Sequence, residues 1–181
     1  MHISKKNLKK LSVIKLLATD VDGVLTDSGM YYGEDGIEQK KFSTRDGMGI
    51  SLVKNAGIIV AIVTSEKTKI VEQRANKLKI EELHQGVHSK IEILEKIRAK
   101  YSLKWSEIAY IGDDINDLEV MERVGFAATP FDGSMWNKKR AHLITKLKGG
   151  EGCVREVCDL ILKGQKLDKE IISLYKNQKI I

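Results

Sequence analysis

The chain has 181 residues, of which 42% are hydrophobic, and this suits a single domain spanning 1–181 with a substantial buried core. No apolar run approaches the roughly 20 residues of a membrane span, and the lysine-rich N-terminus lacks the apolar segment of a secretory signal, so we expect a cytoplasmic protein with no membrane partner. The net charge of +6 is concentrated in residues 1–15 and 136–181, whose scattered lysines without interleaved aromatic residues indicate solvated tails and not nucleic-acid binding.

Apolar runs alternate with helical patterns along the chain, which predicts a parallel sheet with crossover helices. We expect strands at 14–19, 58–63, 83–85, 108–111, 126–128 and 142–144. We expect helices at 47–56, 67–78, 90–101, 115–124, 135–139 and 152–162. Residues 27–42 break the alternation, because two short strand-like runs flank a turn rich in Gly and Asp, and this predicts a β-hairpin.

Polar residues follow the ends of three expected strands. Asp20 and Asp22 come after the first strand, Thr64 after the second and Asp113 after the fourth. The carboxyl ends of parallel strands meet at one edge of a sheet, so these side chains should lie together. Two aspartates at the end of a buried strand repel each other and lose solvation unless a cation binds them. With Lys90 at the start of the third expected helix, this set of residues suits Mg²⁺ held against a phosphate.

These residues also match a known pattern. The runs DVDGV at 20–24 and GDDIND at 112–117, with Thr64 and Lys90 between them in the chain, resemble the four motifs of the haloacid dehalogenase superfamily of phosphohydrolases. The resemblance implies a Rossmann-like parallel sheet sandwiched by helices, and Mg²⁺ as the cofactor.

The resemblance also implies roles for single residues. Asp20 would be the nucleophile and a metal ligand, Asp22 the proton donor and a metal ligand, and Asp113 a further metal carboxylate. Thr64 and Lys90 would bind the phosphate, although Thr64 could be an ordinary helix N-cap and Lys90 a plain surface lysine.

The loop after the fourth strand carries three supporting residues. Asp114 is expected to orient metal-bound waters or Lys90, whereas Asn116 and Asp117 are expected to support the loop.

The chain has no room for a cap domain, because one expected helix fills residues 43–57 and the hairpin should project over the site. Residues 42–50 and 149–156 are similar to stretches of the capless group that acts on 2-keto-3-deoxy sugar-acid phosphates. Members are tetramers in which hairpins pack together and a neighbouring subunit helps to cover each site, so the resemblance implies a homotetramer. It covers about 12–165 and leaves the tail 166–181 outside.

Four residues could contact the sugar acid. Arg45 could bind it or pair with Asp46 or Glu38, and Arg155 could reach the mouth of the site. Glu66 and Lys77 are eleven positions apart, about three helical turns, which predicts that they share one helix face.

The sequence favours neither an eight-carbon nor a nine-carbon substrate. Relatives specific for Kdo 8-phosphate, an eight-carbon substrate, usually show Gly-Arg where this chain has Ser65-Glu66. An acidic residue here with a lysine eleven positions on is similar to relatives that act on nine-carbon nonulosonate 9-phosphates. The runs 45–47 and 155–160 look more like the Kdo 8-phosphate branch.

The expected function is therefore a Mg²⁺-dependent phosphatase of a 2-keto-3-deoxy sugar-acid phosphate, serving lipopolysaccharide or surface-glycan synthesis. One alternative is a phosphatase of other small sugar phosphates. Another is a non-catalytic oligomerisation module, like those fused to cytidylyltransferases, which have lost catalytic aspartates. The intact residues Asp20, Asp22, Lys90 and Asp113 argue against the second alternative.

Overall fold

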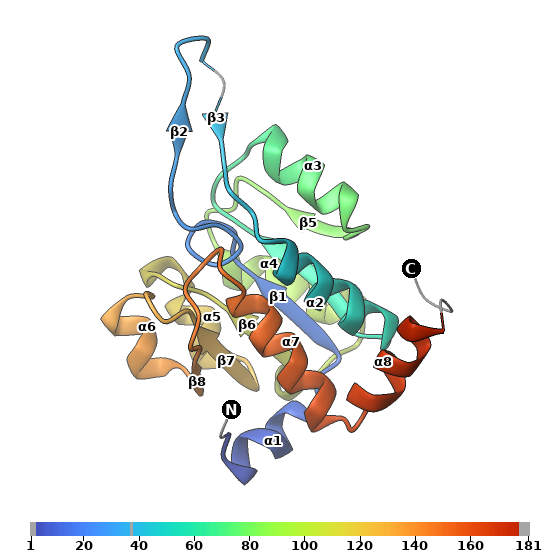
Figure 1. Cartoon of the computed structure of the whole chain (residues 1–181). Coiled ribbons are helices and arrows are strands. Elements are labelled where there is room, and N and C mark those ends of the chain that lie inside the picture. The colour runs from blue at the N-terminus through green and yellow to red at the C-terminus, as the bar shows by residue number, and fades with distance from the viewer. Residues whose placement is uncertain (1–2, 37, 178–181) are drawn as a thin grey trace.

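The computed structural model describes residues 3–36 and 38–177, and in this part of the chain a parallel six-stranded sheet lies between two layers of helices (Figure 1). The strands are β1 (Leu16–Thr19), β4 (Ile59–Val63), β5 (Glu82–His84), β6 (Ile108–Ile111), β7 (Phe126–Thr129) and β8 (Leu143–Ile144). Their order is β5-β4-β1-β6-β7-β8, and every neighbouring pair is parallel. The expected Rossmann-like α/β fold is confirmed.

The helices cover both faces of this sheet. They are α1 (Lys5–Leu11), α2 (Thr44–Asn55), α3 (Lys69–Lys77), α4 (Lys90–Lys100), α5 (Leu118–Arg123), α6 (Met135–Arg140), α7 (Cys153–Gly164) and α8 (Asp168–Lys176). Side chains of α2 and α7 share one hydrophobic core with Leu17, whereas side chains of α4 and α5 share the other with Leu16 and Ala18. Alternate residues of β1 thus face opposite layers, which is the two-residue period of a strand. Because β1 is buried on both faces, its sequence is a continuous apolar run.

Helices α1 and α8 lie in the regions near the two ends of the chain where the sequence indicated solvated tails. Helix α1 buries Leu11 completely, and Ile171 of α8 is only 3% exposed. The segment that follows α1 lies beside the segment that precedes α8, because Gln165 donates a hydrogen bond from Nε2 to the carbonyl of Ile14. Of the expected tail 166–181, residues 178–181 lie outside the described residues.

The hairpin is present and projects beyond the carboxyl end of the sheet (Figure 1). Its strands β2 (Tyr31–Tyr32) and β3 (Glu38–Gln39) are antiparallel, and Ile37, part of the second expected run, lies outside the described residues. A bridge between Thr26 and Phe42 closes its base. Within the described ranges, the segment between the hairpin and β4 forms α2 and no cap domain, and no helix is both long and apolar enough to cross a membrane.

Candidate active site

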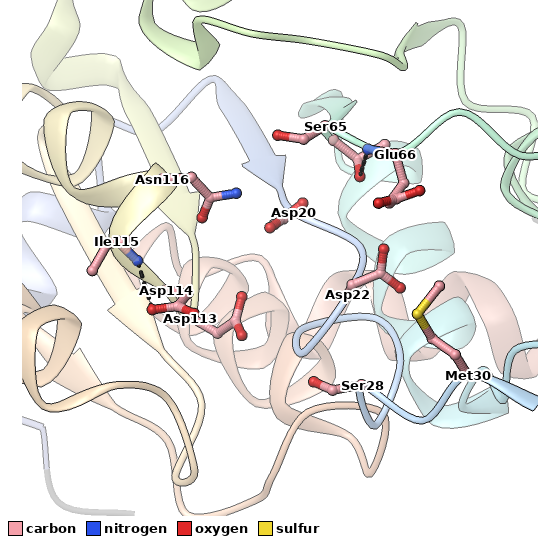
Figure 2. A pocket seen from close by; sticks show the side chains of 11 residues that line it. Asp20, Asp22, Ser28, Met30, Ser65, Glu66, Asp113, Asp114, Ile115 and Asn116 are labelled. Atoms are coloured by element: carbon pink, nitrogen blue, oxygen red, sulfur yellow. Dashed lines mark hydrogen bonds between the residues drawn. The ribbon is translucent and has the colours of Figure 1, made fainter.

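The carboxyl ends of the central strands surround a cavity of about 340 Å³. The register of the sheet aligns Thr19 at the end of β1 with Ile62 of β4 and Ile111 of β6, so the loops that follow these strands meet. Figure 2 shows the carboxylates of Asp20, Asp22 and Asp113 gathered around the same space. The cavity is lined by Asp20, Asp22, Ser28, Met30, Thr64, Ser65, Glu66, Asp113, Asp114, Ile115 and Asn116.

Lys90 lies behind this lining and joins two aspartates. Its Nζ is 2.7 Å from Oδ2 of Asp20 and 2.6 Å from Oδ1 of Asp117, and its side chain is 1% exposed. Burial alone would lower the pKa of Lys90, but the two carboxylates outweigh it and raise the pKa above its ordinary value. Lys90 is also the first residue of α4, where the helix dipole disfavours a cation. A buried lysine at that position indicates a role beyond helix stability, and Lys90 is not a plain surface lysine.

Asp117 contributes more than the loop support that was expected of it. It is fully buried, and its Oδ1 accepts from Lys90 Nζ and from Tyr110 Oη at 2.6 and 2.5 Å. Its Oδ2 accepts from the backbone N–H groups of Asp113 and Asp114 at 2.9 and 3.3 Å. Lys90 is therefore oriented by Asp117 and not by Asp114, whose own Oδ1 accepts from the N–H of Ile115. The contact of Asp117 with the N–H of Asp114 is also part of a capping box at the 3₁₀ turn Ile115–Asp117, which precedes α5.

The donor set at the cavity floor suits a hard divalent cation. Carboxylate oxygens of Asp20, Asp113 and Asp117 lie within 4.8 Å of one another. Because four donors already occupy Asp117, we assign the free lone pairs to Asp20 and Asp113. Burial, with the charge of Asp117, raises the pKa of Asp20 to about 6, and burial with the charges of Asp20 and Asp117 raises the pKa of Asp113 to about 8. Such crowded acids fit Mg²⁺, which prefers oxygen ligands.

Gly23 makes room for this cluster. Its backbone has a φ of +81°, and a Cβ at this position would lie 2.0 Å from Oδ2 of Asp113. Any other residue would therefore be strained and would displace the carboxylate, which explains the glycine directly after Asp22.

Asp22 is bound by a residue that the sequence did not point to. Lys40, on the returning leg of the hairpin, places its Nζ 2.7 Å from Oδ1 of Asp22 and 3.5 Å from Oε1 of Glu38. The carboxylate of Asp22 thus contacts Lys40, and Asp22 does not belong to the group of close carboxylates formed by Asp20, Asp113 and Asp117 among the described residues. The expected role of Asp22 as a metal ligand therefore gains no support from this carboxylate, whereas Asp20 and Asp113 are brought together as expected. Nothing in the spacing separates Lys40 from its neighbour Lys41, which pairs with Asp27 at 2.8 Å.

Thr64 lies at the end of β4 and is 1% exposed. Its Oγ1 accepts from the N–H of Glu66 at 3.3 Å. The N-cap of α3 is Thr68, whose side chain accepts from the N–H of Val71, so the alternative of Thr64 as an ordinary helix N-cap does not hold.

Glu66 and Lys77 do not share a helix face, contrary to the sequence expectation. Because Thr68 starts the helix, α3 spans Lys69–Lys77 and Glu66 remains in the loop that lines the cavity. Lys77 is the last residue of α3, exposed and outside the lining. Lys77 thus lies at the far end of a nine-residue helix, which is about 12 Å long from its first to its last residue.

Neither expected arginine lines the cavity within the described residues. Arg45 is exposed in the first turn of α2, and the Nε of Arg155 donates to Oδ1 of Asp159 at 2.8 Å, one turn along α7. Asp46 is buried and accepts from the N–H of Arg155 at 2.8 Å. Burial raises the pKa of Asp46 to about 6, although this backbone N–H group favours its ionised form.

Known proteins similar to this chain are phosphatases and related hydrolases. A family model for haloacid dehalogenase-like hydrolases matches residues 82–156. The 3-deoxy-D-manno-octulosonate 8-phosphate phosphatase of Escherichia coli strain K12 is 42% identical over 168 residues, which are 92% of this chain and 89% of the relative. The phosphatase of the same name from Yersinia pestis is 42% identical over 158 residues, 87% of this chain and 84% of the relative.

A solved structure matches equally well. The phosphatase of that name from Moraxella catarrhalis, crystallised with a magnesium ion, a phosphate ion and a KDO molecule, superposes with a TM-score of 0.92 at 37% identity, over 96% of this chain and 99% of that one. These matches extend over most of both chains. The chain therefore belongs to the family of 3-deoxy-D-manno-octulosonate 8-phosphate phosphatases, within the haloacid dehalogenase-like hydrolases.

Proposed function

We propose that this protein is a Mg²⁺-dependent phosphomonoesterase that hydrolyses 3-deoxy-D-manno-octulosonate 8-phosphate (Kdo 8-phosphate) through a phosphorylated Asp20. The observation that carries the proposal is the chain of ion pairs from Asp20 through Lys90 to Asp117, next to Asp113 at the floor of the cavity. The names of the relatives support the substrate.

The first half of the reaction transfers the phosphoryl group to the protein. A carboxylate oxygen of Asp20 attacks phosphorus, the ester P–O bond breaks, and Asp22 gives its proton to the leaving alkoxide. Lys90 offsets the negative charge of Asp20 as the anionic phosphate approaches. Thr64 accepts from a backbone N–H, so its own hydroxyl hydrogen can be donated to a phosphate oxygen.

The second half releases the phosphate. Water attacks the aspartyl phosphate, its proton passes to Asp22, and inorganic phosphate leaves as Asp20 is regenerated. Asp20 and Asp113 would hold Mg²⁺, which when bound neutralises charge on the phosphate oxygens.

The distal part of the sugar acid would lie against Met30, Ser65 and Glu66, which line the cavity. Figure 2 shows Met30 and Glu66 across the cavity from Asp113. Glu66 favours a second candidate substrate, a nine-carbon nonulosonate 9-phosphate, because relatives with an acidic residue at this position act on such compounds. We also propose Arg45, Lys77 and Arg155 as substrate ligands. Because they do not line the cavity of their own subunit, they would contact the sugar bound in a neighbouring subunit.

We also propose a homotetramer in which the hairpins pack together. Met30, Tyr31 and Tyr32 are 43%, 55% and 70% exposed on a projecting hairpin, and burying such aromatic side chains stabilises an interface. Light scattering should give four times the subunit mass, and a fully active monomer at assay concentration would contradict the assembly. By its resemblance to the sugar-acid phosphatases, we place the enzyme in lipopolysaccharide synthesis in a bacterial cytoplasm.

The function is tested by a side-by-side assay of Kdo 8-phosphate, a nonulosonate 9-phosphate and common hexose phosphates, with and without Mg²⁺. We expect the highest kcat/KM with Kdo 8-phosphate, and we expect no turnover of any substrate without Mg²⁺. Asp20→Asn should lower turnover by at least about a thousandfold, whereas Asp27→Asn, outside the cavity lining, should not. Equal rates on all sugar phosphates would overturn the proposed substrate, and an active Asp20→Asn variant would overturn the nucleophile.

A further inference from the structure

Lys40 is the unexpected residue of the site. It reaches from the returning leg of the hairpin to Asp22, and its Nζ lies 2.7 Å from Oδ1. The side chain of Lys40 is 0% exposed, although the hairpin around it is mostly open to solvent. A lysine is rarely buried to this degree unless a partner holds its charge, and here the partner is the expected proton donor.

The other oxygen of Asp22 is left unsatisfied. Oδ2 is enclosed by protein and has no hydrogen-bond partner among the described residues. A carboxylate that was free to rotate would turn such an oxygen toward water or a donor, because an unpaired buried acceptor is costly. The carboxylate is held through its other oxygen, because Oδ1 accepts from Lys40 Nζ at 2.7 Å and from Thr26 Oγ1 at 3.4 Å. Lys40 is the one cation that contacts Asp22 within the described residues.

Lys40 itself does not reach the substrate space. Asp22 lines the cavity and Lys40 is not among the lining residues, so Lys40 would act on the reaction through the carboxylate of Asp22. This placement separates Lys40 from Lys90, which contacts the expected nucleophile directly.

We propose that Lys40 is a positioning residue that holds the carboxyl group of Asp22 in place for proton transfer, and that it thereby ties the hairpin to the chemistry. The inference rests on the proposed function, in which Asp22 protonates the leaving alkoxide. As that proton leaves Asp22, negative charge develops on its carboxylate 2.7 Å from the ammonium of Lys40, which stabilises the charge. Without Lys40 the carboxylate can rotate away from the leaving group.

The sharpest test is the dependence of kcat/KM on the leaving group, because this constant reports the steps up to phosphoryl transfer to Asp20. Kdo 8-phosphate has a basic alkoxide leaving group that needs a proton, whereas nitrophenyl phosphate has an acidic phenol that hardly does. For Lys40→Met we expect kcat/KM to fall roughly 10- to 100-fold with Kdo 8-phosphate, within the usual contribution of general acid catalysis, and less than about threefold with nitrophenyl phosphate. Across a series of aryl phosphates, the rate should fall more steeply as the phenol becomes more basic.

Lys41→Met is the matched control, because Lys41 lies on the same hairpin leg and pairs with Asp27 instead; its leaving-group dependence should equal that of the wild type. A double-mutant cycle gives a second readout. If Lys40 acts through Asp22, then adding Lys40→Met to Asp22→Asn should cost little further activity. Lys40→Gln replaces Lys40→Met in both measurements if the methionine variant does not fold.

The possible outcomes separate this inference from the proposed function. An equal loss with every leaving group, or losses that multiply in the double variant, would mean that Lys40 only supports the fold, and would overturn the inference while leaving the function intact. If the wild type hydrolyses aryl phosphates but not Kdo 8-phosphate, the proposed substrate fails, and the aryl series still decides the role of Lys40.

Discussion

Tyr110 donates a hydrogen bond from its Oη to Oδ1 of Asp117 over 2.5 Å, the same oxygen that Lys90 contacts. Both Tyr110 and Asp117 are fully buried. Burial, with the charge of Asp117, raises the pKa of Tyr110 well above its ordinary value, so the phenol remains a donor at neutral pH. Through Tyr110, strand β6 thus helps to fix Asp117, and Asp117 in turn holds Lys90.

Tyr110→Phe should therefore weaken both stability and turnover. We expect the free energy of unfolding to fall by about 1.5–3 kcal/mol, the usual value for a hydrogen bond to a charged group, and kcat to fall because Asp117 no longer fixes Lys90 as firmly. Urea unfolding and steady-state kinetics measure the two effects. Tyr101→Phe is the control. Tyr101 donates to Glu82 over 2.7 Å, and neither residue lines the cavity, so this variant should leave kcat unchanged. Equal kcat in the two variants would contradict the role of Tyr110.

Mg²⁺ binding should depend on pH through Asp113. Burial and neighbouring carboxylates raise the pKa of Asp113 to about 8 in the metal-free protein, so at pH 7 this carboxyl group mostly holds its proton. A bound cation displaces that proton, and the affinity for Mg²⁺ should therefore rise between pH 6 and 8. Calorimetry in two buffers with different ionisation enthalpies measures the released proton. Asp113→Asn should bind Mg²⁺ weakly and without this release, and a pH-independent affinity of the wild type would refute the expectation.

Asp46 should make the stability of the fold depend on pH. Its pKa is raised by burial to about 6 from the ordinary 3.8, so the folded protein holds this proton more tightly than the unfolded chain. The free energy of unfolding should then fall as the pH rises from about 4 to 6, by up to about 3 kcal/mol. Asp46→Asn removes this contribution. Urea unfolding of the wild type and of Asp46→Asn, both without metal and at several pH values, gives their free energies of unfolding. The value for the wild type minus that for Asp46→Asn should decrease as the pH rises from about 4 to 6. A constant difference would show that Asp46 does not titrate as argued.

Glu66 should influence the choice of substrate more than the rate of the chemistry. Its carboxylate lies in the loop beyond Thr64 and lines the cavity, where it would meet the part of the sugar remote from phosphorus. Glu66→Arg should raise the ratio of kcat/KM for Kdo 8-phosphate over a nonulosonate 9-phosphate by roughly tenfold, equivalent to about 1.4 kcal/mol. Hydrolysis of aryl phosphates should stay nearly unchanged.

Glu72→Arg is the matched control for that experiment. Glu72 is exposed in the first turn of α3 and outside the cavity lining, so it reports the effect of the charge change alone. An unaltered ratio in Glu66→Arg, or the same shift in Glu72→Arg, would remove the support for a nine-carbon substrate.

The sequence predicts the sheet and the gathering of Asp20, Thr64 and Asp113 because both follow from one rule: apolar runs alternating with helices give a parallel sheet, and its carboxyl ends meet. It does not separate Lys40 from Lys41, because the twist of a short hairpin decides which of two adjacent side chains turns inward.

Two further differences have physical causes. The expected common face of Glu66 and Lys77 fails because Thr68 starts the helix after Glu66. Helices α1 and α8 are short, with seven and nine residues, so their stability comes from the packing of residues such as Leu11 and Ile171 and not from local propensity. Such tertiary packing is not visible in a local pattern.

Helices α1 and α8 both lie at the end of the molecule away from the hairpin (Figure 1). The close approach of Leu11 to Gly164, where a Cβ on the glycine would lie 2.8 Å from the leucine Cβ, joins the first helix to the end of α7 at this pole. An enzyme immobilised on a sensor or a resin through α1 or α8 would therefore present its cavity and its hairpin to the solution. Such a preparation suits single-molecule and flow measurements in which substrate access must not depend on the attachment.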